Sequence, residues 1–150
     1  MARELPTSGK LVAGICFAAL GYVSASTYAL NLPEAWRISW FLETSAALGF
    51  LVGWLVMGRL VGVSLRSAAG RGLTTAIWLL FWTLLSFSIH EMLMRSLDKR
   101  YLMPMDAVGG AVEIWIFLAK LTLNAEFLST LLIGGLISGV LAELANRFWR

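Results

Sequence analysis

Residues 11–30 read LVAGICFAALGYVSASTYAL, a run of 20 residues without a charged side chain. At 1.5 Å per residue, a helix of this length extends about 30 Å, which matches the hydrocarbon core of a bilayer. Lys10 precedes the run and marks a membrane boundary. Val23-Ser24-Ala25 resembles a signal-peptidase site, but the apolar stretch continues beyond it. We therefore expect a retained membrane-spanning helix.

The composition of the whole chain supports this interpretation. Of its 150 residues, 59% are hydrophobic and only 14% are charged, and the mean hydropathy is +0.77. A soluble domain is about half apolar and about a quarter charged. The net charge of +3 comes from Lys and Arg between apolar runs, not from a basic stripe with interleaved aromatics, so no nucleic-acid binding is expected. We predict one all-α domain over residues 1–150, with the lipid bilayer as its solvent.

Three further apolar runs are predicted to cross the membrane, at residues 40–61, 73–89 and 127–145. Residues 106–123 are also long enough, but they contain Glu113 and Lys120, which lie seven residues apart on one helix face. If this segment crossed, each intramembrane charge would cost roughly 2.5–3.5 kcal/mol at the bilayer centre. We therefore predict a polytopic bundle of four transmembrane helices with an additional amphipathic helix at the membrane interface.

The distribution of cationic residues predicts the orientation. Four spans with the N-terminus inside place seven cationic residues in the cytoplasm and five outside, whereas five spans place six on each side. The seven are Arg3, Lys10, Arg59, Arg66, Arg71, Arg147 and Arg150. The positive-inside rule thus favours four spans with both termini cytoplasmic. Residues 59–72 then form a connection between the second and third spans, and residues 91–100 can extend the third helix into water.

Small residues recur four positions apart in three of the runs. The pairs are Gly49 with Gly53 and Gly135 with Gly139, and the first run adds Gly14, Ala18, Gly21 and Ala25. Such spacing lets two helix backbones approach closely in lipid. The favoured interpretation is contact within the bundle. The alternative is docking to other transmembrane helices, in a second copy or in a larger complex.

One cluster near the end of the third span resembles a soft-metal site. His90, the only histidine, stands close in sequence to four of the six methionines, which are Met92, Met94, Met103 and Met105. Thioether and imidazole groups suit ions such as Cu(I). However, Met92 and Met94 point to different faces of a helix, so we favour packing of the methionines at an interface and predict no metal site.

No pattern in the chain indicates an enzyme. The sequence has one histidine, no zinc-protease helix motif and no phosphate-binding glycine loop, so we predict no catalytic residue and no cofactor. Cys16 is the only cysteine and is expected to pack as a small hydrophobe. Glu43, Glu126 and Glu143 lie at predicted helix ends, where we expect their carboxylates to reach water.

Taken as a whole, the chain resembles the TrgA family, small membrane proteins of alphaproteobacteria associated with tellurite resistance. The likeness rests on Ala47–Trp54, Phe81-Trp82, Glu91-Met92, Arg100-Tyr101 with Pro104, Glu113-Ile114, Ile137–Glu143 and Trp149-Arg150. The chain departs from the family pattern at His90 and Leu102-Met103, which argues against a shared metal site. The resemblance implies a role in tolerating tellurium oxyanions and supplies no catalytic residues.

The leading hypothesis is therefore a non-enzymatic protein of the bacterial inner membrane, similar to this family. A first alternative is an accessory subunit of a larger respiratory or photosynthetic membrane complex, with Trp54, Trp78 and Trp82 packed against partner helices or pigments. A second alternative is a small transporter or soft-metal handler that uses His90 and the nearby methionines.

Overall fold

The computed structural model describes residues 8–32, 34, 39–60, 64–98 and 103–148. Its elements are α1 (Ser8–Asn31), α2 (Phe41–Val52), the π-helical turn η2 (Gly53–Met57), α3 (Gly58–Leu60), α4 (Leu65–Leu97), α5 (Pro104–Leu121) and α6 (Ala125–Phe148). Arg3, Arg100, Tyr101, Leu102, Trp149 and Arg150, named above, lie outside the described residues.

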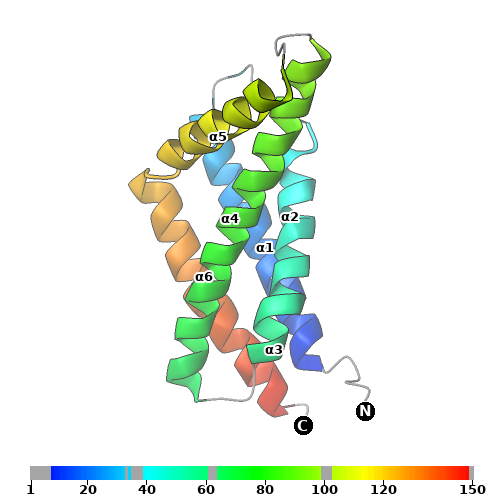
Figure 1. Ribbon diagram of the computed structural model, residues 1–150. Helices are drawn as coiled ribbons and strands as arrows, with labels where there is room; N and C mark the ends of the chain where they lie inside the picture. Colours follow the sequence, from blue (N-terminus) through cyan, green and yellow to red (C-terminus); the bar gives the residue numbers. More distant parts are fainter. Residues whose placement is uncertain (1–7, 33, 35–38, 61–63, 99–102, 149–150) are drawn as a thin grey trace, which may run out of the picture.

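Four helical segments in the described part of the chain are long and apolar enough to cross a membrane: Gly9–Asn31, Phe41–Leu60, Leu65–Leu97 and Ala125–Phe148. They run side by side, and α5 lies across one end of them (Figure 1). The start of α1 and the end of α6 meet at the opposite end, where the Cβ of Asn146 lies 3.0 Å from the Cβ position of Gly9. The predicted four-helix membrane bundle with an additional helix is thus confirmed.

The third spanning helix is longer than predicted at its N-terminal end. Helix α4 begins at Leu65, whereas residues 59–72 were expected to form a connection. Ser64 caps the helix, since its hydroxyl accepts a hydrogen bond from the backbone N–H of Ser67 at 3.3 Å. The expectation was wrong because Gly72 does not break the helix. It is buried against α6 instead.

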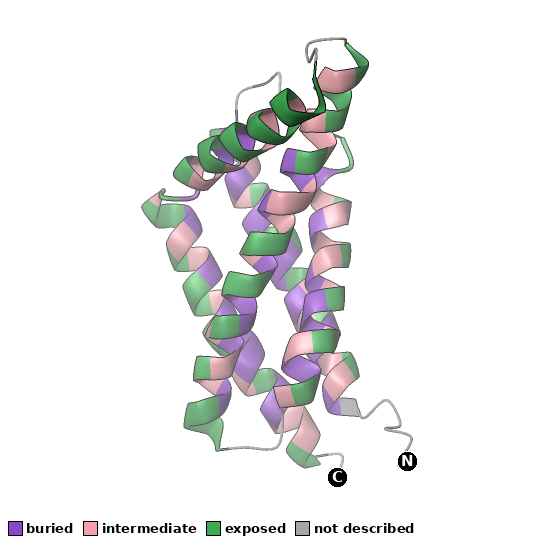
Figure 2. Ribbon diagram, in the orientation of Figure 1, coloured by how far each residue is buried: buried purple, intermediate pink, exposed green. Residues whose placement is uncertain are grey.

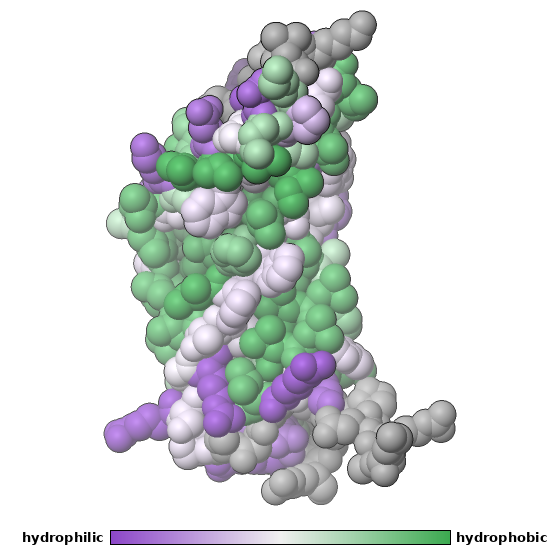
Figure 3. Space-filling model, in the orientation of Figure 1, coloured by the Kyte–Doolittle hydropathy of each residue, from purple (hydrophilic) through white to green (hydrophobic). Residues whose placement is uncertain are grey.

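The exposed surface of the bundle carries many large apolar side chains. Buried faces of the helices point inward (Figure 2). The outer faces carry aliphatic side chains that are more than half exposed, namely Ile15, Leu55, Ile77 and Ile133. Hydrophobic residues cover most of the middle of the face seen in Figure 3, and hydrophilic groups gather towards its two ends. A patch of this size needs a lipid environment to cover it.

Helix α5 is held on the end of the bundle by its inner face. Ile114 and Leu118, one turn apart, are buried, whereas Glu113 and Lys120 are exposed. The Tyr28 hydroxyl of α1 donates a hydrogen bond to the Leu118 carbonyl at 2.9 Å. The Ser88 hydroxyl of α4 donates to the carbonyl of Ala111, near the middle of α5. The predicted amphipathic helix is confirmed, because its charges avoid burial.

Replacing Tyr28 with phenylalanine tests this attachment. The Leu118 carbonyl belongs to the last turn of α5, where carbonyls have no partner within the helix, so Tyr28→Phe leaves it unsatisfied. We expect the free energy of unfolding to fall by about 1–2 kcal/mol. Hydrogen exchange of the α5 amides is expected to rise more than that of the α6 amides. Uniform exchange across both helices would contradict a local role for this bond.

Candidate functional site

The glycines of the first two spans lie where α1 and α2 cross. A side chain added to Gly49 would collide with the carbonyl oxygen of Phe17. A Cβ added to Gly53 would lie 2.7 Å from the carbonyl oxygen of Ala13. Ala18 borders the same contact, and Gly14 faces the ring of Phe50. These predicted packing residues therefore bring two helices of the same chain together.

The glycines of the last span lie in a second contact of this kind, between α6 and α4. A Cβ on Gly139 would lie 2.5 Å from the Ala68 carbonyl oxygen and 2.7 Å from the Cα of Gly72. One on Gly135 would lie 2.8 Å from the Cβ of Ala76. Both glycines are buried inside the bundle, so they do not form an external docking face.

The residues of the suggested metal cluster differ in their exposure and in their contacts. The ring of His90 stands edge-on to that of Trp40, with centroids 4.7 Å apart. Met94, Met103 and Met105 are exposed, and Met92 is half-buried. Within the described ranges, no group of three or more His, Cys, Asp or Glu side chains is placed to hold a metal ion.

Among the described residues, Glu143, on the last turns of α6, is a carboxylate buried in the bundle. Its residue is only 1% exposed, and its carboxylate pairs with the Nε of Arg147 at 3.3 Å. The expectation that Glu143 reaches water was wrong. It lies four residues after Gly139 and therefore continues the glycine face that packs against other helices. Glu113, which was singled out instead, lies exposed on α5.

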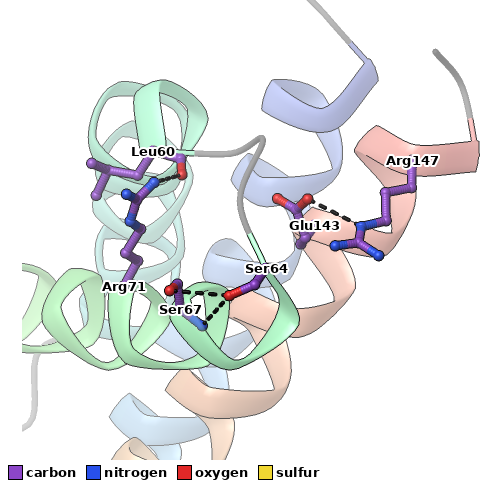
Figure 4. A network of polar contacts seen from close by, with 6 residues as sticks. All are labelled: Leu60, Ser64, Ser67, Arg71, Glu143 and Arg147. Carbon is purple, nitrogen blue, oxygen red and sulfur yellow. Dashed lines mark hydrogen bonds and ion pairs between the residues drawn. The ribbon is translucent and has the colours of Figure 1, made fainter.

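Cationic and polar groups surround this end of the bundle (Figure 4). The Arg71 guanidinium, from α4, donates a hydrogen bond to the Leu60 carbonyl at the end of α3. A cation here complements the negative end of the helix dipole and satisfies a terminal carbonyl. Arg71 thus ties α4 to the end of α3. Glu143 and Arg147 lie nearby on α6.

A cavity lies in the other half of the bundle, below α5. Its walls come from α1, α2, α4 and α6, with Leu118 of α5. One signal in the sequence pointed to it, since Gly21, Ser24 and Tyr28 share one face of α1 and two of them are polar. The sequence alone did not predict that hydroxyl residues of several helices line one cavity there.

Comparison of the chain with protein-family models, with curated proteins and with solved structures finds no match. The residues above are therefore assigned from geometry alone. They form two polar sites in an apolar bundle, one around Glu143 and one in the cavity beside Ser24.

Proposed function

We propose that this protein is a non-enzymatic protein of the bacterial inner membrane that contributes to tolerance of tellurium oxyanions. The resemblance to the TrgA family, which extends over most of the chain, supplies the phenotype. The observation that supports a stand-alone protein is the packing of Gly72 against Gly135 and Gly139. These glycines pack against helices of the same chain, so they are not exposed for contact with a partner helix.

The proposed orientation places both termini in the cytoplasm. Its support is the gathering of cationic residues at the end where α1 begins and α6 finishes. These residues are Lys10, Arg59, Arg66, Arg71 and Arg147. An excess of Lys and Arg marks the cytoplasmic side of membrane proteins.

Growth of a deletion strain on tellurite tests the proposal. We expect deletion to lower the highest tellurite concentration that permits growth, and the intact gene to restore it. Gly72→Leu should not restore it, because the added side chain would meet the backbone of α6. Gly70→Leu should restore it, because no atom lies within 4 Å of a Cβ there. Equal growth of the deletion strain and the parent would refute the proposal.

An accessory subunit is the second candidate, and one feature of α4 favours it. Trp78, Phe81 and Trp82 are 46%, 40% and 44% exposed, and neighbouring rings meet edge to face. The Phe81 ring also meets that of Trp115 on α5, with centroids 6.2 Å apart, so the group lies where α4 passes α5. Large exposed aromatic side chains of this kind suit contact with a partner helix.

Affinity purification in mild detergent, followed by mass spectrometry, tests this candidate. One partner in a fixed ratio is expected, and Trp78→Ala combined with Trp82→Ala should release it. Replacing Ile133, an exposed residue on α6, serves as the control. A partner-free protein, or a partner retained by the double variant, would eliminate this surface as a docking site.

A further inference from the structure

The cavity below α5 is small and is lined along part of the length of α4. Its volume is about 50 Å³, and it is partly open rather than enclosed. Its lining on α4 begins at Leu79 and ends at Glu91, a distance of about 18 Å along the helix axis. A volume of about 50 Å³ distributed along this length fits an alkyl chain better than a bulky ring system.

The walls of the cavity are mainly apolar. Aliphatic side chains are joined by the rings of Tyr28, Phe41, Phe87 and Phe127. Three of these rings form one group, since the Tyr28 ring centroid lies 6.0 Å from that of Phe41 and 5.4 Å from that of Phe127. An occupant must therefore be apolar over most of its length.

Several hydroxyl groups on the wall already donate hydrogen bonds to backbone carbonyls. Ser45 donates to the Phe41 carbonyl at 2.8 Å, Thr83 to that of Leu79 at 2.8 Å, and Thr122 to that of Ala119 at 2.6 Å. Each hydroxyl oxygen keeps lone pairs that can accept a hydrogen bond. Among the described lining residues none is cationic, and the Glu91 carboxylate pairs with Arg95 at 3.0 Å. The cavity therefore suits a neutral hydrogen-bond donor and disfavours an anion.

Ser24 is the group that points to a ligand. It lines the cavity, is 5% exposed, and its hydroxyl has no hydrogen-bond partner. A buried polar group without a partner is costly, and in native proteins it usually marks a missing water or ligand. Unlike the other three hydroxyls, Ser24 has both a proton to donate and lone pairs to accept with.

We propose that this cavity binds the hydroxyl end of an uncharged, membrane-dissolved alcohol with an unbranched alkyl chain. The hydroxyl of the alcohol exchanges hydrogen bonds with Ser24, and the first carbons lie between the aromatic walls. The rest of the chain leaves through the open side into lipid. This site is independent of the proposed role in tellurite tolerance.

Photolabelling with an octanol that carries a diazirine on its chain tests the proposal. The probe is added to the purified full-length protein in lipid nanodiscs, and adducts are mapped by mass spectrometry. We expect adducts on lining residues of α1 and α4. Excess 1-octanol should reduce this labelling at least fivefold, whereas octane at equal membrane concentration should leave it unchanged. Competition by octane equal to that by octanol would overturn the proposal.

Two serine variants make the test specific. Ser24→Ala should reduce cavity labelling at least fivefold while leaving the helical circular dichroism and thermal transition intact, since it removes an unpartnered hydroxyl. Ser26→Ala is the matched control, because Ser26 is exposed and donates to the Val23 carbonyl at 2.7 Å. Labelling of Ser24→Ala at the wild-type level, or adducts confined to lipid-facing residues, would exclude the site.

Discussion

Replacing Gly72 with alanine is expected to lower the free energy of unfolding by about 3 kcal/mol, the upper end of the usual cost of overpacking. The added Cβ would meet the carbonyl oxygen of Gly135 and lie 2.7 Å from the Cα of Gly139. Both obstacles are backbone atoms of α6, so no side-chain rotation relieves the collision. Helices α4 and α6 must then separate along their whole contact. Titration with sodium dodecyl sulfate in mixed micelles, followed by circular dichroism, measures the change.

Gly70 provides the matched control in the same helix. It lies two residues before Gly72, and apart from its chain neighbours and the nearby backbone of its own helix no atom lies within 4 Å of its Cβ position. Gly70→Ala is expected to raise the free energy of unfolding by about 0.5–1 kcal/mol, because alanine has the higher helix propensity. Similar effects of the two substitutions would show that α4 and α6 do not approach each other at Gly72.

Replacing Glu143 with alanine is expected to lower the free energy of unfolding by about 2–3 kcal/mol. The carboxylate is 1% exposed, so its removal leaves a void and breaks the pair with Arg147. The cost stays below that of a fully buried ion pair because the Arg147 side chain is 50% exposed and can turn to water. Glu143→Gln should cost less, since it preserves the shape. The same detergent titration measures both variants.

Glu113 is the comparison for Glu143. It is exposed on α5, so Glu113→Ala should leave the free energy of unfolding unchanged within experimental error. The two substitutions remove the same chemical group from the same chain. A larger effect at Glu113 than at Glu143 would contradict the burial of Glu143 and the exposed position of α5.

The helices were predictable because their signals are large and local. Twenty apolar residues in a row have few alternatives to a membrane span, and the charges of Glu113 and Lys120 directly oppose insertion. The start of α4 was not predictable by the same means. Four of the eight residues from 65 to 72 are Arg or Gly, which resemble a connection, and only the packing of Gly72 on α6 explains the helix there.

The candidate sites were harder to predict because burial depends on partners that the sequence does not display. Glu143 stands near a helix end, as does Glu126, yet only Glu143 shares a face with Gly135 and Gly139. Its spacing from those glycines was the available signal. The sequence signal at Ser24 was weaker, since the hydroxyl of a serine in a membrane helix usually donates a hydrogen bond to a backbone carbonyl of its own helix. Its lack of a partner is visible only in the folded bundle.

The position of α5 is tested most directly by labelling single cysteines on either side of it. In a chain with Cys16 replaced by alanine, Asp98→Cys and Leu123→Cys each place one exposed thiol at a boundary of this helix. A membrane-impermeant maleimide should label both from outside intact cells, and Ser67→Cys only after permeabilisation. Four spans with α5 on the membrane surface predict this result. Labelling of Asp98→Cys and Leu123→Cys from opposite sides would mean that α5 crosses the bilayer and would contradict the account.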